Sequence, residues 1–242
     1  MKFSLLLCVA FILCICKVSG QQFNKSINKD SLFKTILKDI PEEKKKELLN
    51  AYNSGSEGTK EFLLVMYSLP KSSKKELIEN IKANYDKITL LKTAYAKLVP
   101  PNYTVSIEFN PENIITSTKE SIDLKITLLK GTEAIVNQEW NLDFNSDKLK
   151  EMLASIGWNK ETVKNIKKLL AEAHCISIEN GKVATIGFAR SGLGKYSYLL
   201  FNSSLTADKA KQYNDGCSYI FYGKNIVLEY AGGAFGPQCF PD

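Results

Sequence analysis

Arginine is the side chain that points most directly to binding chemistry here, because Arg190 is the only arginine among 32 basic residues. A planar guanidinium makes bidentate contacts with carboxylates and phosphates that lysine does not reproduce. We expect a loop between two strands at this point, in which a structural salt bridge is the favoured role of Arg190. The functional hypothesis is that Arg190 faces a small anion, a sugar or a peptide, and a third possibility is an arginine without a special role. The candidate ligand-binding residues are Arg190, Ser191, Gly192, Gly194, Lys195 and Tyr196.

The glycines of the same segment do not fit a nucleotide-binding motif. In a P-loop a lysine follows the second conserved glycine, whereas Leu193 follows Gly192 here. The dinucleotide pattern requires a third glycine where Ser197 stands, and it leads into a helix, whereas a strand is expected here. No cofactor is therefore predicted.

The single histidine, His174, is next to Cys175, and neighbouring side chains of a strand or helix point in different directions. A catalytic Cys–His pair needs two converging side chains, so we expect no such nucleophile. Zinc is disfavoured as well, because the chain contains no pair of cysteines at C-x2-C spacing. We predict neither a catalytic residue nor a metal site.

Three cysteines follow the N-terminal leader: Cys175, Cys217 and Cys239. A hairpin with its turn at Gly223-Lys224 would place Cys217 opposite Tyr230, and a glycine-rich stretch then lets Cys239 return beside Cys217. The sequence favours a Cys217–Cys239 disulfide, which closes a loop of ~22 residues and is worth about 3 kcal/mol. A disulfide from Cys175 to either partner is the alternative.

The N-terminus has the organisation of a secretory signal peptide. Lys2 supplies the positive charge, residues 3–16 are apolar, and Val18-Ser19-Gly20 has small residues before a cleavage site. The apolar run is shorter than the ~20 residues that span a bilayer. We predict residues 1–20 to be a signal peptide cleaved after Gly20. The protein would then be secreted or periplasmic, without a transmembrane segment in its mature chain.

Residues 21–98 are predicted to be a helical region that begins with a polar tail. Pro41 followed by two glutamates is typical of a helix start, and Ser73 precedes Glu76 by three residues, which is the spacing of a capping box. Apolar residues then recur every three or four positions up to Leu98. This long apolar stripe requires a partner, either the preceding helices or the sheet.

Residues 102–242 are predicted to form an α+β domain with an antiparallel sheet. Alternating apolar residues indicate three strands between residues 103 and 144, and two helices follow up to Ala173. Asn180-Gly181 and Gly223-Lys224 predict two further hairpins. Helices and strands come in blocks, so the class is α+β, with the helical part (31–98) packed with the β meanders. That part is either a separate domain or continuous with the sheet.

The surface charge does not single out a partner. The formal net charge is +6, but lysines and acids are interleaved. Sequence-specific binding of nucleic acid relies on arginine, so no nucleic acid is expected. The aromatic residues of the last third suit buried strand positions or, alternatively, an exposed platform for a sugar or peptide. Glycosylation sequons start at Asn24, Asn102 and Asn202, and they matter only in a eukaryotic secretory pathway.

These patterns favour an exported, non-catalytic binding protein or an envelope-associated protein over an enzyme. One alternative is a secreted hydrolase with two carboxyl groups in one cleft, one of them with a raised pKa. Another is an inhibitor or interaction domain, which would expose a large apolar patch.

Overall fold

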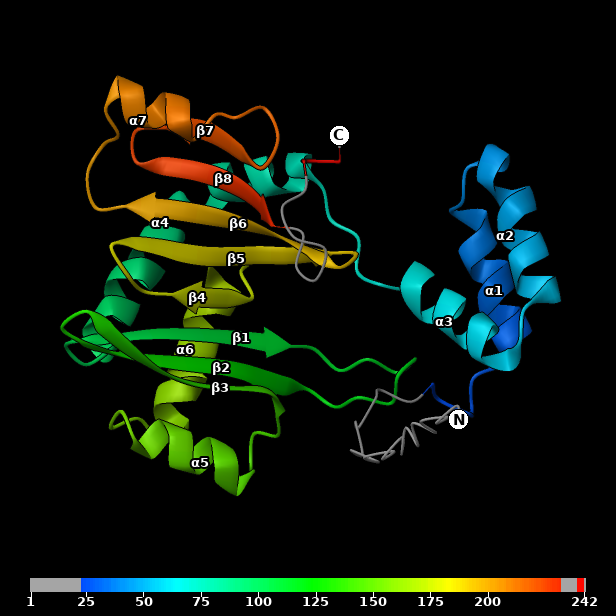
Figure 1. Ribbon diagram of the computed structural model, residues 1–242, viewed down its shortest axis with the longest axis horizontal. Helices are drawn as coiled ribbons and strands as arrows, with labels where there is room; N and C mark the ends of the chain where they lie inside the picture. The colour runs from blue at the N-terminus through cyan, green and yellow to red at the C-terminus, as the bar shows by residue number, and fades with distance from the viewer. Residues whose placement is uncertain (1–22, 232–238, 242) are drawn as a thin grey trace, which may run out of the picture.

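The computed structural model describes residues 23–231 and 239–241, and its centre is an antiparallel sheet of eight strands (Figure 1). The order across the sheet is β3-β2-β1-β4-β5-β6-β8-β7. The strands are β1 (Tyr103–Asn110), β2 (Ser121–Lys130), β3 (Glu133–Leu142), β4 (Ser177–Glu179), β5 (Val183–Ser191), β6 (Gly194–Phe201), β7 (Tyr219–Gly223) and β8 (Ile226–Ala231). The helices of the described residues are α1 (Lys29–Lys38), α2 (Glu42–Ser54), α3 (Glu57–Tyr67), α4 (Lys74–Leu98), α5 (Asp147–Ala154), α6 (Lys160–Glu172) and α7 (Ala207–Gln212). The predicted α+β class is confirmed.

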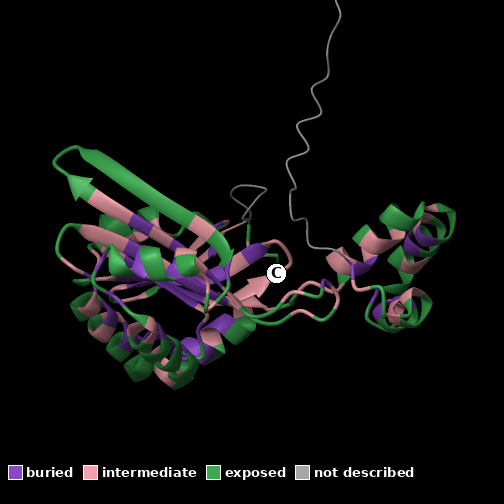
Figure 2. Ribbon diagram, turned by 90° about the horizontal axis from the view of Figure 1, so that it is seen from below, coloured by how far each residue is buried: buried purple, intermediate pink, exposed green. Residues whose placement is uncertain are grey.

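One face of the sheet packs against helices, and α4 and α6 lie behind it in Figure 1. Alternation along the strands directs Val105, Ile107 and Leu124 to this face, where they are buried. Figure 2 shows the buried residues gathered between the sheet and these helices. The other face carries the alternate, mostly polar residues, among which Glu108 of β1 stands opposite Ser177 of β4.

Helix α4 begins and ends where the sequence predicts. The Glu76 N–H donates to Ser73 Oγ, and the Ser73 N–H donates to a Glu76 carboxylate oxygen at 2.8 Å, which completes the capping box. The apolar stripe of α4, including Leu77 and Leu91, belongs to the same core as the sheet. The sheet is therefore the partner that this stripe requires.

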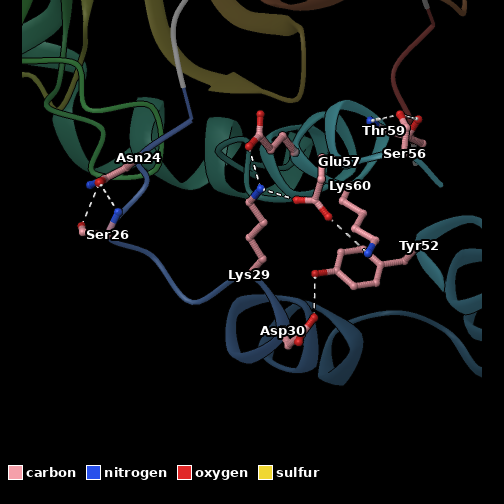
Figure 3. A network of polar contacts seen from close by, with 10 residues as sticks. Asn24, Ser26, Lys29, Asp30, Tyr52, Ser56, Glu57, Thr59 and Lys60 are labelled. Carbon is pink, nitrogen blue, oxygen red and sulfur yellow. Dashed lines mark hydrogen bonds and ion pairs between the residues drawn. The ribbon is translucent and has the colours of Figure 1, made fainter. Parts of the chain in front are cut away.

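Helices α1, α2 and α3 share a second, smaller core that contains Phe33, Tyr52 and Leu64. The rings of Phe33 and Tyr52 stack with their centroids 3.8 Å apart. Lys29 at the start of α1 forms ion pairs with two carboxylates of α3, Glu57 at 2.7 Å and Glu61 at 2.6 Å (Figure 3). The helical region of the sequence thus divides between two cores.

The segment predicted to be a glycine-rich loop is mostly strand. β5 continues to Ser191 and β6 starts at Gly194, so Gly192 and Leu193 alone form the turn. Gly192 has φ +59°, and glycine at the first turn position is what a type II′ hairpin favours. The loop prediction is wrong because these small and polar residues extend two paired strands instead of separating them.

The last hairpin, β7–β8, carries the disulfide between Cys217 and Cys239, which confirms the predicted pair. The turn of this hairpin lies at Lys224-Asn225 and not at the predicted Gly223-Lys224, and a bulge between Phe221 and Gly223 offsets part of the shift. The N–H of Tyr230 donates to the carbonyl of Ser218, so the expected position of Tyr230 opposite Cys217 is wrong by one residue. Cys175 is free and buried.

Strand β4 joins the two halves of the sheet, β3-β2-β1 on one side and β5-β6-β8-β7 on the other. It is only three residues long, and it meets β1 through the pairs Ser106↔Glu179, Ile107↔Ile178 and Glu108↔Ser177. We call this junction the β1–β4 seam. The chain between its two strands contains β2, β3, α5 and α6.

The predicted signal peptide, residues 1–20, lies outside the described residues. In the part of the chain that is described, no helix combines the length and the apolar character needed to cross a bilayer.

Candidate functional site

Arg190 and Lys195 stand opposite each other at the adjoining ends of β5 and β6, and both reach one carboxylate. Arg190 Nε donates to Glu108 Oε1 at 2.7 Å, and Lys195 Nζ donates to Glu108 Oε2 at 3.0 Å. Glu108 lies across the seam on β1, and its side chain is only 9% exposed. The two cations offset the cost of burying this carboxylate.

A glycine on β5 makes room for Lys195 to reach across the sheet. A Cβ atom on Gly187 would lie 2.1 Å from Ser177 Oγ and 3.1 Å from Lys195 Cδ. Because Gly187 has no side chain, Lys195 crosses β5 and its Nζ lies 3.3 Å from Ser177 Oγ on β4. The position of Lys195 therefore depends on a residue eight places earlier in the chain.

The structural salt bridge, one of the roles expected for Arg190, is present in the structure. A longer contact of 3.9 Å also joins Arg190 Nη2 to Asp123 Oδ2 on β2. The Arg190 side chain nevertheless remains 41% exposed. Arg190 thus combines a structural contact at Nε with guanidinium N–H groups that solvent or a ligand can reach.

The other four predicted site residues hold the β5–β6 hairpin in place. Ser191 Oγ donates to the carbonyl of Ser72 at 2.9 Å, and the Gly192 N–H donates to the carbonyl of Pro70 at 2.8 Å. Gly194 lies against the Tyr230 side chain, whose hydroxyl oxygen would be 2.5 Å from a Cβ atom, and Tyr196 is fully buried. A ligand-binding role for the whole run stays a prediction, and among the six Arg190 alone lines the cavity described next.

This cavity, the arginine cleft, has a volume of about 620 Å³ and lies between the α3–α4 connection, the β1–β2 loop and the sheet. Its volume is within the usual range of small-molecule sites. Besides Arg190, it is lined by residues 68–70, 110–114, 118, 121, 123 and 141. Asparagines, hydroxyl groups and carboxylates make up most of the polar lining, and Leu69, Pro70 and Ile114 supply apolar surface.

A second cavity of about 610 Å³ adjoins the arginine cleft and shares the lining residues Thr118, Ser121 and Asn141 with it. It extends to the N-terminal segment at Phe23 and Asn24. Both cavities lie against the β1–β2 loop, and we refer to them together as the polar groove. A ligand that entered both would have to be longer than a single small molecule.

Asn141 lies where the two cavities meet. Its backbone has φ +55°, a conformation that asparagine tolerates better than most residues, and its N–H donates to Asp123 Oδ1 at 2.8 Å. Its side-chain amide is exposed and has no hydrogen-bond partner among the described residues. The amide is therefore available to a ligand as both donor and acceptor.

The charges around the arginine cleft do not favour an anion. Glu108 already pairs with Arg190, and Asp123 and Glu112 add two carboxylates to the lining. An incoming anion would approach these carboxylates as well as the guanidinium, so part of the attraction would be lost. The lining suits an uncharged ligand with many hydroxyl or amide groups.

The sequence did not indicate Asp123 or Asn141 as site residues. They come from β2, which pairs with β1, and from β3, which pairs with β2. No fixed spacing in the sequence marks this cluster, because Asp123 and Asn141 are 67 and 49 residues away from Arg190 and reach the same cavity only through the order of the strands.

A hydrolase of the alternative kind needs two carboxyl groups in one cleft, one of them with a raised pKa. Burial raises the pKa of Glu229 on β8, while hydrogen bonding to Tyr219 and the charge of Lys195 act in the opposite direction. Glu108 on β1 is four strand spacings away, about 19 Å at the usual interval. Glu229 and Glu108 are therefore too far apart to act on one bond. The neighbouring pair is Glu108 and Asp123, which are register partners on β1 and β2 and both contact Arg190.

His174 and Cys175 diverge as expected. His174 has φ +51° and is exposed, whereas Cys175 is buried. Burial raises the pKa of the Cys175 thiol to about 12, so it is protonated at neutral pH. Within residues 23–231 and 239–241, no three His, Cys, Asp or Glu side chains gather as ligands for a metal ion.

Comparison with family models, curated proteins and solved structures finds no match for this chain. The function is therefore argued from the arginine cleft and from the sequence.

Proposed function

We propose that this is an exported, non-catalytic binding protein that holds a neutral, hydroxyl-rich ligand, a short carbohydrate chain, in the arginine cleft. The observation that carries the proposal is an exposed guanidinium whose charge is balanced by the carboxylates of Glu108 and Asp123, in the same cavity as the free amide of Asn141. A guanidinium donates to neutral hydroxyls, and an asparagine amide both donates to them and accepts from them, so neither group requires a charged partner. The adjoining cavity accommodates a second sugar unit.

Binding can be tested by titrating the folded protein with neutral oligosaccharides and following the affinity by calorimetry. We expect Asn141→Ala to weaken binding about 3- to 10-fold, which corresponds to one or two lost hydrogen bonds. Asn137→Ala is the matched control, because Asn137 is an exposed asparagine of the same strand outside the cleft. Equal affinities of the two variants, or binding of acidic ligands alone, would contradict the proposal.

Export is supported by the signal-like leader and by the Cys217–Cys239 disulfide, since disulfides persist in oxidising compartments. Mass spectrometry of the unreduced protein recovered outside the cell should give a chain that starts at Gln21 with this bond formed. Recovery inside the cell with residues 1–20 attached and all thiols reduced would contradict export.

A second candidate function, an interaction domain, is favoured by the exposed apolar side chains of the β2–β3 hairpin. β3 is an edge strand, and Ile135, Val136 and Trp140 are between 52% and 62% exposed, as the exposed strand in Figure 2 shows. Long apolar edge strands tend to pair with another chain. We expect Val136→Lys to reduce self-association in light scattering, whereas Ser203→Lys, outside the hairpin, leaves it unchanged.

A further inference from the structure

The asparagines of the three glycosylation sequons differ in whether their side chains form hydrogen bonds within the fold. Asn24 is held at the edge of the groove by its own side chain: Nδ2 donates to the carbonyl of Ile114 at 2.9 Å. Its Oδ1 accepts from the N–H and the hydroxyl of Ser26, the third residue of the same sequon (Figure 3). A sugar on Asn24 Nδ2 would replace one of its two N–H groups and place a bulky group beside the carbonyl of Ile114, at the contact with the β1–β2 loop.

Asn102 and Asn202 have the opposite properties. Both are exposed in turns, and the side-chain amide of each has no hydrogen-bond partner among the described residues. Asn102 has φ +67° and connects α4 to β1, while Asn202 follows β6 and is flanked by exposed Ser203 and Ser204. Neither position has to give up a contact in order to carry a bulky group.

The two free asparagines lie at the same end of the strands, away from the arginine cleft. β1 and β6 run in opposite directions because three antiparallel pairings separate them. The start of β1 and the end of β6 therefore lie at the same end of the strands. The cleft lies at the opposite end of the strands, where β1 ends at Asn110 and β6 begins at Gly194 (Figure 1). Because β1 and β6 have eight residues each, their two ends are about 26 Å apart.

We propose that Asn102 and Asn202 are the N-glycosylation sites of this protein and that Asn24 is left unmodified. The inference rests on the proposed export and applies in a eukaryotic secretory pathway. In the transfer from a lipid diphosphate oligosaccharide, Nδ2 of the asparagine loses a proton and bonds to the anomeric carbon. The bond from that carbon to the phosphate oxygen breaks, and the lipid diphosphate leaves. Both glycans then lie at the end of the strands opposite the cleft and leave the polar groove open.

The sites can be mapped on the full chain secreted from a eukaryotic cell line. Enzymatic removal of N-glycans in heavy-oxygen water converts each occupied asparagine into labelled aspartate, which peptide mass spectrometry locates. We expect label at Asn102 and Asn202 and none at Asn24. Label at Asn24, or a lack of label at either of the other two, would overturn the assignment.

Matched variants separate glycosylation from effects on folding. Thr104→Val and Ser204→Ala each destroy one sequon but keep its asparagine. Each variant should therefore lose one glycan and show a correspondingly lower apparent mass on a gel. Ser26→Ala should leave the mobility unchanged, and a loss of one step in this variant would contradict the proposal. A mobility unaffected by Thr104→Val or by Ser204→Ala would contradict it as well.

Export and glycosylation are distinguished by a second preparation that carries the leader of an established secreted protein. If residues 1–20 fail to direct secretion but this preparation carries label at Asn102 and Asn202, the export proposal falls and the site assignment stands. If both preparations are secreted without label at these residues, the site assignment falls alone.

Discussion

Glu108 forms ion pairs with Arg190 and Lys195, which belong to the other half of the sheet. Its removal leaves both cations without their nearest carboxylate. We expect Glu108→Ala to lower the free energy of unfolding by about 2–3 kcal/mol. Loss of one partner from a fully buried pair costs about 3–5 kcal/mol, and the partial exposure of Arg190 and Lys195 reduces this figure. Urea unfolding measures the change.

Glu112→Ala is the control for this prediction, because Glu112 is an exposed carboxylate at the same cleft. It should change the free energy of unfolding by less than about 0.5 kcal/mol. If the two variants were equally stable, Glu108 would contribute no more to the free energy of unfolding than an exposed carboxylate does.

Glu229 should make the stability of the protein depend on pH in the opposite sense to a typical salt-bridged acid. Burial raises its pKa in the folded state above the unfolded value. The stabilisation from its bound proton is complete below the unfolded pKa and is lost as the pH rises through the folded pKa. We expect Glu229→Gln to raise the melting temperature by a few degrees at pH 7.

The melting temperatures of wild type and Glu229→Gln should converge when the pH is lowered to about 4, where the carboxyl of the wild type is protonated in the folded state. Thermal unfolding at a series of pH values tests this. A variant that is less stable than the wild type at pH 7 would show that Lys195 and Tyr219 fully compensate the buried charge.

Among the secondary-structure elements, β5 depends most on the absence of a side chain at one position. We expect Gly187→Ala to destabilise the protein by about 2 kcal/mol, because its Cβ would lie 2.1 Å from Ser177 Oγ and force that side chain and Lys195 to move. Gly58→Ala is the control, since Gly58 lies in α3 and a Cβ there meets only Ser56 Oγ at 4.0 Å.

Alanine is the better helix former, so Gly58→Ala should be neutral or stabilising by up to about 1 kcal/mol. Chemical denaturation of both variants compares the two positions directly. A neutral Gly187→Ala would mean that Lys195 reaches Glu108 by another path.

Most elements could be predicted from the sequence because their signals are local. The capping box at Ser73 and Glu76 involves residues that are close in the chain, and the structure confirms it. The hairpin predicted at Asn180-Gly181 also forms, but the pair Glu179↔Thr185 shows a longer connection than a two-residue turn. The β5–β6 loop prediction failed because polar residues on an open sheet face resemble loop residues. In the last hairpin the turn lies at Lys224-Asn225, one residue later than predicted, and the bulge near Tyr222, which had no signal in the sequence, offsets part of that shift.

The candidate site was less predictable than the fold. Arg190 could be selected because it is unique, but its partner Glu108 looks like any other acid in a strand. Their contact follows from the order of β1, β4 and β5, which depends on pairing between distant segments. For the same reason the arginine cleft, built from four segments, could not be foreseen.

At the scale of the whole molecule, the disulfide fixes the residues at the C-terminal end of the described chain onto the core. The ring of Phe240 lies 5.7 Å from that of Tyr196 and 6.0 Å from that of Tyr230, and its N–H donates to the carbonyl of Cys217 at 2.9 Å. We expect the double variant Cys217→Ser, Cys239→Ser to lose about 3 kcal/mol of stability.

Reducing agent provides the control for this prediction. It should lower the melting temperature of the wild type to that of the double variant and should leave the double variant unchanged, because Cys175 is already a free thiol. A wild type that is insensitive to reduction would show that the packing of Phe240 alone holds the segment.

The β1–β4 seam has a kinetic consequence. Each half of the sheet contains hairpins that close over short distances in the chain, whereas the seam joins residues about seventy positions apart and therefore assembles slowly. Arg190 and Lys195 belong to one half and Glu108 to the other. We therefore expect the hairpins within each half to form before the seam, and the ion pairs of Glu108 to form only when the two halves of the sheet come together.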